Sequence, residues 1–272
     1  MNEWAGLSLD RPRVMGVLNV TPDSFSDGGD FLDPEAAVSA GVAMAAAGAD
    51  IIDVGGESTR PQSRPTPQGE EQRRILPVIS ALAAAGLRVS VDTRHAATMA
   101  AALDAGAAIV NDVYALGYDM AAGPLVAARG CPVILMHMRG IPADMYAHAR
   151  YDDVSADVAR ELDQRIEAAE RAGIARDRIA IDPGIGFAKT AEQSVELLRR
   201  LPELRTLGYP IVVGVSRKSF LGTVTGEQNP RRRLPGSLAA GLFALSRGAA
   251  ILRVHNVPET TQAIKVWRTL TS

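Results

Sequence analysis

The sequence predicts a (β/α)8 barrel, an α/β fold in which eight parallel strands alternate with helices. Eight apolar runs of about four to six residues recur along the chain, and such runs suit strands that are buried on both faces. The segments between them carry helical patterning and mostly stop at glycine, which indicates repeated βα units. The length of 272 residues also fits one barrel of this kind. We therefore expect a single domain over residues 1–272.

Each predicted strand is an apolar run that stops at a small polar cluster. The first is VMGVL at 14–18, which stops at Asn19, and the fifth is PVILM at 132–136, which stops at His137. In chain order the expected strands are 14–18, 49–52, 87–91, 107–110, 132–136, 178–181, 210–215 and 249–252.

The helices are predicted from their end signals. Asp33 is the expected N-cap of the first helix, Pro34 occupies its first position, and Gly48 ends it. Most of the later helices also stop just before a glycine that precedes the next strand. The expected helices are 34–47, 67–85, 98–105, a shorter one at 121–128, 151–172, 191–204, 232–247 and 258–270.

Charge and cysteine content exclude several classes of partner. The net charge is −2, and basic residues alternate with acids, so no basic face for nucleic acid is expected. The arginine run at 231–233 is interpreted as a solvated helix start. Cys131 is the only cysteine, so we expect a buried packing residue and no intramolecular disulfide. The N-terminus lacks the apolar core of a signal peptide and no stretch could span a bilayer, so we expect a cytoplasmic protein without membrane partners.

The polar clusters at the strand ends are expected to form one site. In a parallel barrel the carboxyl ends of all strands open on one mouth, where catalytic groups usually lie. The first strand closes on the eighth, which brings Asn19 near Arg253 and His255. Arginine and histidine can bind phosphate groups, and an amide oxygen suits Mg²⁺. We therefore predict a site for a phosphorylated group here, against the alternatives of a local ion pair for Arg253 and a structural role for His255.

A second subsite is expected deeper in the mouth, from the third, fourth, sixth and seventh strands. Its side chains are Asp92, Asn111, Asp182 and Lys218. Carboxylates, an amide and an ammonium at the floor of a cavity suit a flat heterocycle with many hydrogen-bonding groups. The alternative is a buried Asp–Lys ion pair that stabilises the barrel, although desolvation makes buried pairs poor stabilisers.

Long loops after the first two strands are predicted to form a third subsite. Both exceed the usual βα connection, which suggests movable lids, although ordinary surface insertions would look the same. Glycines permit bending, and other residues offer aromatic and polar surfaces. The residues concerned are Phe25, Gly28, Gly29, Thr59, Arg60 and Pro61.

The strand ends carry eight motifs, some of them long. They are MGVLNVTPDSFSDGG at 15–29, IIDVGGESTRP at 51–61, SVDT at 90–93, IVND at 109–112, LMHM at 135–138, IDPGIGF at 181–187, VGVSRKSFLG at 213–222 and RVH at 253–255. On these motifs, from about residue 13 to 265, the chain resembles the dihydropteroate synthases, the sulfonamide targets of folate synthesis.

The resemblance implies an activity and a set of residue roles. These enzymes join 6-hydroxymethyl-7,8-dihydropterin diphosphate to p-aminobenzoate, giving 7,8-dihydropteroate and diphosphate, on a TIM barrel with Mg²⁺; a homodimer is also implied. By resemblance Asn19 would bind Mg²⁺. The pterin would be held by Asp92, Asn111, Asp182, Phe187, Lys218 and Arg253, p-aminobenzoate by Phe25, Thr59, Pro61 and Ser219, and diphosphate by Arg253 and His255, with Asp23, Asp27 and Arg60 assisting loop closure.

The expected chemistry is a displacement in which the C–O bond breaks before the amine attacks. Arg253 and His255 with Mg²⁺ would stabilise the diphosphate, and the acidic floor, with Asp27, would stabilise the cationic pterin. An arylamine is already neutral, so no general base is assigned, and His137 is interpreted as a packing or orienting residue. Asn256 stands where the family usually has aspartate after the histidine.

Two other hypotheses remain open at the level of sequence. A lyase of the same fold could use Lys218 as a Schiff-base nucleophile, which requires an apolar setting and a lowered pKa. A non-catalytic pterin-binding paralogue would keep the polar floor but lose the loop and anion-binding residues. This chain keeps both sets of residues, which favours the synthase.

Overall fold

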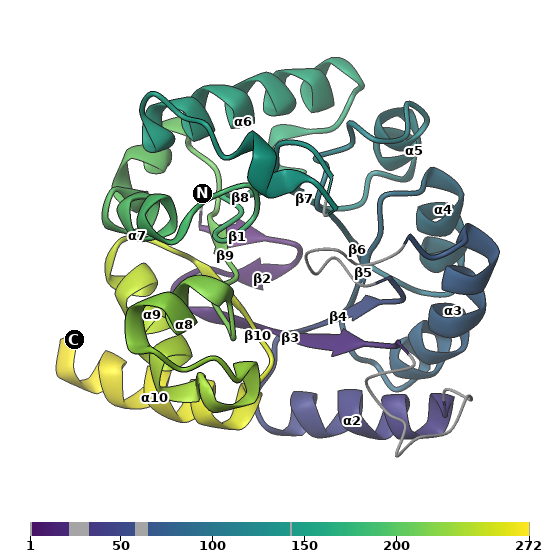
Figure 1. Cartoon of the computed structure of the whole chain (residues 1–272). Coiled ribbons are helices and arrows are strands. Elements are labelled where there is room, and N and C mark those ends of the chain that lie inside the picture. The colour runs from purple at the N-terminus through teal and green to yellow at the C-terminus, as the bar shows by residue number, and fades with distance from the viewer. Residues whose placement is uncertain (1, 22–32, 58–64, 142, 272) are drawn as a thin grey trace.

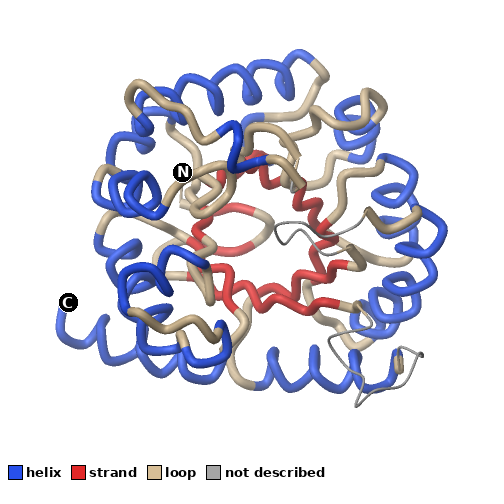
Figure 2. The backbone as a smooth tube through the Cα atoms, in the orientation of Figure 1, coloured by secondary structure: helices blue, strands red, loops and turns tan. Residues whose placement is uncertain are grey.

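The computed structural model describes residues 2–21, 33–57, 65–141 and 143–271, and it contains an eight-stranded parallel barrel ringed by helices (Figures 1 and 2). All eight predicted strands are present. Their bounds are β3 Arg13–Asn19, β4 Ile51–Gly55, β5 Val89–Asp92, β6 Ile109–Asp112, β7 Val133–Met136, β8 Ile179–Asp182, β9 Val212–Val213 and β10 Ile251–Val254.

The sheet closes on itself in the order that the sequence predicts. Neighbouring strands pair in parallel in the order β8-β7-β6-β5-β4-β3-β10-β9, so the first barrel strand pairs with the last. The two remaining edges meet through a single parallel bridge between Ile181 and Ile211. The predicted (β/α)8 barrel is therefore confirmed.

The eight predicted helices are also present and surround the barrel (Figure 2). The first begins as predicted, because Asp33 accepts a hydrogen bond from the Glu35 amide at 2.9 Å and Pro34 follows it. The helices are α2 Pro34–Ala46, α3 Gln68–Ala84, α4 Ala96–Asp104, α5 Ala122–Arg129, α6 Val154–Arg171, α7 Ala191–Arg199, α9 Leu234–Ser246 and α10 Val257–Thr271.

Three local elements differ from the prediction. Helix α7 ends at Arg199 and a 3-10 segment, η3 Leu201–Leu207, continues the chain, because Pro202 lacks the N–H that an α-helix would need. A short helix, α8 Ser219–Thr225, follows β9 and ends at Gly226 with φ of 79°. An N-terminal hairpin, β1 Glu3–Trp4 with β2 Leu7–Ser8, precedes the barrel.

The hairpin closes one end of the barrel and leaves the other for the site. Trp4 is 1 % exposed, packs against Met15, Ile51 and Ile251 inside the barrel, and donates its indole N–H to the Arg178 carbonyl at 3.0 Å. Strand side chains alternate, so the positions two residues further along β4 and β10 also face inward, nearer the mouth. These positions are Asp53 and Arg253.

The rest of the core lies between the strands and the helices. Cys131 belongs to this layer and is 8 % exposed, as expected of a packing residue. Among the helices in the described ranges, none is long and apolar enough to cross a membrane.

Candidate active site

Four strands bring an ion-pair network together inside the mouth of the barrel. Arg253 on β10 donates from Nε to Asp53 Oδ2 on β4 at 2.7 Å, and from a terminal nitrogen to Asp92 Oδ2 on β5 at 2.7 Å. Asn111 on β6 donates from Nδ2 to the same Asp53 oxygen at 3.0 Å. The predicted diphosphate ligand Arg253 is thus bonded to the predicted pterin floor, so the two subsites are continuous.

Burial makes the charged groups of this network costly to remove from water. Asp53 is fully buried, and two carboxylates lie against a single guanidinium. Burial, helped by Asp53, raises the pKa of Asp92 to about 7, although Arg253 opposes the shift. Buried ion pairs are poor stabilisers, because desolvation consumes most of their attraction. Asp53 Oδ1 has no hydrogen-bond partner within the described parts of the chain.

Asp53 is a site residue that the sequence analysis placed in no subsite. The signal that could have found it is a carboxylate inside an otherwise apolar strand, IIDVG, at a position that faces the barrel interior.

Lys218, Phe187 and Asp182 form the opposite side of the floor. Lys218 lies just before α8, and its Nζ lies 3.7 Å from the centre of the Phe187 ring. Burial lowers the Lys218 pKa to about 7, Arg253 lowers it further, and Asp182 and Asp92 oppose the shift. Asp182 is buried at the end of β8 and accepts a hydrogen bond from the Gly184 amide at 2.7 Å. The predicted floor residues therefore lie on strands and turns that face one space.

His255 and Asn256 are held by the segment between β9 and α8. His255 Nδ1 lies 3.0 Å from the Ser216 hydroxyl, which also accepts from the His255 amide at 3.2 Å. The Asn256 side-chain oxygen accepts two hydrogen bonds from Arg217, at 3.1 and 2.7 Å. An amide thus supplies the oxygen that an aspartate would supply, without its negative charge, and the site is more positive beside His255 as a result.

The remaining predicted residues divide into two groups. Asn19 is the last residue of β3, half-buried, and faces the barrel interior by strand alternation from Met15. Ser219 is exposed at the start of α8. The other predicted site residues lie outside the described residues, and they are Asp23, Phe25, Asp27, Thr59, Arg60 and Pro61.

Tyr146 is a second residue that sequence analysis missed. It lies in a 3-10 turn, η1 Met145–His148, within the long connection between β7 and α6, and its hydroxyl is 3.4 Å from Ser219 Oγ. The preceding Met145 is buried beside Phe187, which fixes the turn next to the floor. No motif marks this position, because the contact joins residues 73 apart in sequence.

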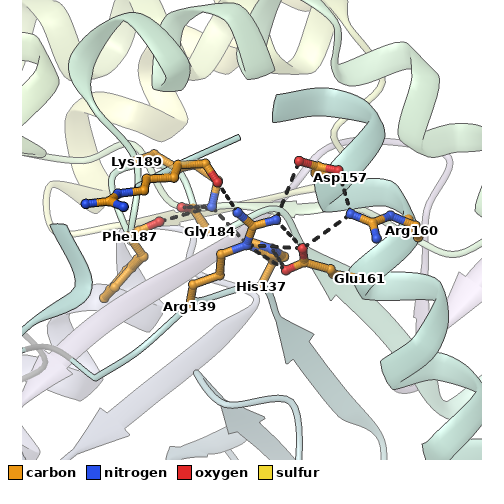
Figure 3. A network of polar contacts seen from close by, with 9 residues as sticks. His137, Arg139, Asp157, Arg160, Glu161, Gly184, Phe187 and Lys189 are labelled. Atoms are coloured by element: carbon orange, nitrogen blue, oxygen red, sulfur yellow. Dashed lines mark hydrogen bonds and ion pairs between the residues drawn. The ribbon is translucent and has the colours of Figure 1, made fainter. Parts of the chain in front are cut away.

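His137 is buried at the end of β7 and lies in a second polar network, with Lys189 and Glu161 (Figure 3). Its Nδ1 lies 3.0 Å from Lys189 and its Nε2 lies 2.9 Å from Glu161. Both ring nitrogens are occupied, which agrees with an orienting role and leaves neither to act as a base.

Comparison with known proteins gives consistent matches. The sequence profile of the family described as pterin binding enzyme matches residues 15–255. The chain is 43 % identical over 267 residues to a dihydropteroate synthase of Neisseria meningitidis serogroup C, covering 97 % of this chain and 94 % of that protein. It is 51 % identical over 257 residues to a probable bifunctional folylpolyglutamate synthase/dihydropteroate synthase of Haloferax volcanii, covering 94 % of this chain but only 30 % of that longer protein.

Several solved structures that are similar to this chain are also named dihydropteroate synthase. The Xanthomonas albilineans dihydropteroate synthase with 4-aminobenzoic acid has a TM-score of 0.93 and 50 % identity, and the match covers 98 % of this chain and 97 % of that one. The same enzyme in complex with 7,8-dihydropteroate has a TM-score of 0.89 and 48 % identity, over 98 % and 96 % of the two chains. A Yersinia pestis dihydropteroate synthase in a sulfonamide drug complex has a TM-score of 0.92 and 42 % identity, over 97 % and 96 %.

Proposed function

Because this chain belongs to the pterin binding enzyme family, we propose a division of roles among the residues at its barrel mouth. The chain carries dihydropteroate synthase activity, a transferase reaction of folate biosynthesis. It joins 6-hydroxymethyl-7,8-dihydropterin diphosphate to p-aminobenzoate and releases diphosphate. The observation that carries the role assignments is the continuous network of Arg253 with Asp53, Asp92 and Asn111.

The pterin binds the polar floor. Its aminopyrimidinone edge donates hydrogen bonds to carboxylates, a role that we assign to Asp92 at the end of β5 and Asp182 at the end of β8, both of them buried. Asn111 adds an amide, and Lys218 donates to the ring carbonyl. Phe187 lines the same pocket. Because Phe187 contacts Lys218, the flat pterin ring can lie close to both side chains.

The diphosphate binds Arg253 and His255 at the boundary of that floor. Two bonds to carboxylates engage Nε and one terminal nitrogen of Arg253, and its other terminal nitrogen is the donor that we assign to the phosphate oxygens. His255 is oriented by Ser216 through its Nδ1, and we assign its Nε2 to the anion.

A divalent metal takes part in catalysis in this family, and we propose Mg²⁺ held by Asn19. The residues present fit it, because Asn19 brings an amide oxygen to the mouth, and Mg²⁺ typically takes few protein ligands and completes its shell with phosphate oxygens and water. Among the described residues, no group of three or more His, Cys, Asp or Glu side chains is placed to hold a metal ion. When bound, the metal supplies stabilisation of negative charge on the leaving diphosphate.

The p-aminobenzoate binds over Ser219 and Tyr146. This outer position leaves its amine directed toward the pterin methylene on the floor. The resemblance assigns the remaining contacts to Phe25, Thr59 and Pro61. It assigns closure of the two loops to Asp23, Asp27 and Arg60. All six lie outside the described residues.

The reaction follows from these positions. The methylene C–O bond breaks and its electron pair leaves with diphosphate, whose negative charge Arg253 and His255 stabilise. The carboxylates of Asp92 and Asp182 stabilise the pterin cation that remains. The arylamine nitrogen then forms the new C–N bond and its proton passes to solvent, so no side chain is needed as a general base.

The activity is tested by mixing purified protein, Mg²⁺, the pterin diphosphate and p-aminobenzoate, and measuring diphosphate and 7,8-dihydropteroate together. We expect equal amounts of both products, formed only when both substrates are present. Absence of product at high enzyme concentration would exclude the activity. Borohydride trapping of a carbonyl substrate on Lys218 would favour a Schiff-base lyase.

The pH dependence of kcat/KM for the pterin diphosphate is expected to be bell-shaped around pH 7. The Asp92 carboxylate, whose pKa is raised to about 7, is lost as the pH falls, and the Lys218 ammonium, whose pKa is lowered to about 7, is lost as the pH rises. Rate profiles from pH 5.5 to 9 check this, and Lys218→Met should remove only the alkaline limb. A flat wild-type profile would contradict the assignment.

Tyr146→Phe is expected to raise the KM for p-aminobenzoate about two- to tenfold, the effect of one neutral hydrogen bond. The reason is that the hydroxyl steadies Ser219, 3.4 Å away, at the outer subsite. The KM for the pterin diphosphate should change little, because Tyr146 does not contact the floor network. Initial rates with each substrate varied in turn decide this, and an equal change in both KM values would count against the outer position.

We also propose that residues 1–272 act as one domain, in a cytoplasmic homodimer. The family resemblance supports the homodimer, and the single buried thiol of Cys131 is compatible with a reducing compartment. Sedimentation of the purified protein tests the dimer.

A further inference from the structure

A buried lysine lies behind the pterin floor and bonds to the turn that carries two of its residues. Lys189 is 2 % exposed, and its Nζ donates to the carbonyl oxygens of Gly184 at 3.1 Å and Phe187 at 3.0 Å (Figure 3). Its third contact is His137 Nδ1 at 3.0 Å. An ammonium has three N–H groups, and here it meets three acceptors.

Hydrogen bonds lead from Lys189 through His137 and Glu161 to Arg139. We call these four residues the Lys189 network. His137 Nδ1 accepts from Lys189, so its Nε2–H donates to Glu161. Burial and Lys189 lower the His137 pKa to about 4, which keeps the ring neutral. Glu161 accepts from Arg139 Nε at 3.0 and 3.1 Å, and the Arg139 guanidinium lies 3.9 Å over the Tyr151 ring.

The turn itself is tightly enclosed. A Cβ added at Gly184 would lie 2.0 Å from the His137 carbonyl oxygen, and one at Gly186 would lie 3.4 Å from the Lys218 side chain. The Gly184 carbonyl accepts from both Lys189 and the Phe187 amide, the latter at 3.0 Å. The backbone between Asp182 and Phe187 is thus held on one side by His137 and Lys189 and contacts Lys218 on the other.

We propose that Lys189 is a positioning residue for pterin binding, which fixes the turn that presents Asp182 and Phe187 to the ring. The proposal rests on the proposed function. A buried ammonium is costly to desolvate, and burial lowers the Lys189 pKa to about 7. Within the described residues Lys189 hydrogen-bonds to the turn and to His137, and its charge acts through space on Asp182 and Lys218.

The test is Lys189→Met, which keeps the length of the side chain and removes its donors and charge. We expect the KM for the pterin diphosphate to rise at least about tenfold, as for one lost charge-assisted contact, while the KM for p-aminobenzoate changes less than about twofold. Lys265→Met on α10 is the matched control, because Lys265 is an exposed lysine far from the turn, and it should leave both constants unchanged.

Two further variants extend the test, and the first of them also covers the case in which Lys189→Met does not fold. Glu161→Gln keeps an acceptor for His137 but removes the charge that holds the network, and it should shift the same KM in the same direction by a smaller factor. Lys189→Gln, which restores two N–H donors, should recover part of the binding lost in Lys189→Met. An equal rise in both KM values, or a lowered Tm with unchanged KM values, would overturn the proposal.

Hydrogen exchange separates this proposal from the assigned activity. The amides of residues 184–188 should exchange faster in Lys189→Met than in the wild type, whether or not turnover is measured, because the turn loses two carbonyl contacts. Unchanged exchange there would overturn the positioning role. Absence of wild-type turnover would instead count against the proposed function alone.

Discussion

Arg253→Ala is expected to lower kcat/KM for the pterin diphosphate by about 10- to 150-fold, as for the loss of one contact to a charged group. The guanidinium is assigned to the leaving diphosphate, whose charge grows as the C–O bond breaks, so the loss should appear in kcat as well as in KM. Initial rates over a range of pterin diphosphate concentrations measure both constants.

The same substitution should also destabilise the fold, because it leaves Asp53 and Asp92 buried beside each other without their cation. Removing one partner of a buried ion pair typically lowers the free energy of unfolding by about 3–5 kcal/mol. Kinetic constants must therefore be referred to the folded fraction. Arg253→Lys keeps the charge without the fork, and Arg247→Ala removes an exposed arginine at the end of α9 as a control. Activity of folded Arg253→Ala equal to that of Arg247→Ala would contradict the diphosphate assignment.

Lys218→Met is expected to lower kcat/KM for the pterin diphosphate at least about tenfold, mainly through KM. The ammonium is assigned to the ring carbonyl, and it is also the cation that lies 3.7 Å from the Phe187 ring. Methionine keeps the length and apolar character of the side chain, so the loss reports on the charge. Direct titration with 7,8-dihydropteroate should show the same factor in Kd.

The outcome also separates the synthase from the lyase. A Schiff-base mechanism requires the lysine as a nucleophile, so Lys218→Arg would be as inactive as Lys218→Met. In the synthase, Lys218→Arg keeps a cationic donor and should retain more activity than Lys218→Met. Equal and complete inactivity of both variants would contradict the binding role.

The barrel could be predicted because each unit carries its own signals. Apolar runs, the Asp33 cap and most glycine stops are local features, and they lie close to the observed element ends, although α7 ends at Arg199 before its predicted end. Helix α8 and the N-terminal hairpin were missed because their elements are short and carry little periodicity. Trp4 of the hairpin fills the end of a barrel that the rest of the chain builds, which is a long-range contact.

Strand order predicts which strand ends share the barrel mouth, but not which side chains bond to one another there. Strand order placed Arg253 beside Asn19, yet its two ion pairs reach Asp53 and Asp92, the former 200 residues away in sequence. Cross-barrel contacts depend on side-chain length and rotamer, which strand order does not specify. For the same reason no role was assigned to Lys189 from the sequence, although the structure places it at the centre of a buried network.

The most direct test of the site is the structure of the enzyme bound to 7,8-dihydropteroate. We predict the pterin ring on the floor, with its aminopyrimidinone edge against Asp92, Asn111 and Asp182 and its carbonyl near Lys218 Nζ, and the benzoate toward Ser219. A pterin ring bound elsewhere, such as the groove between α6, α7 and α8 that Tyr151 and Thr223 line, would contradict the account.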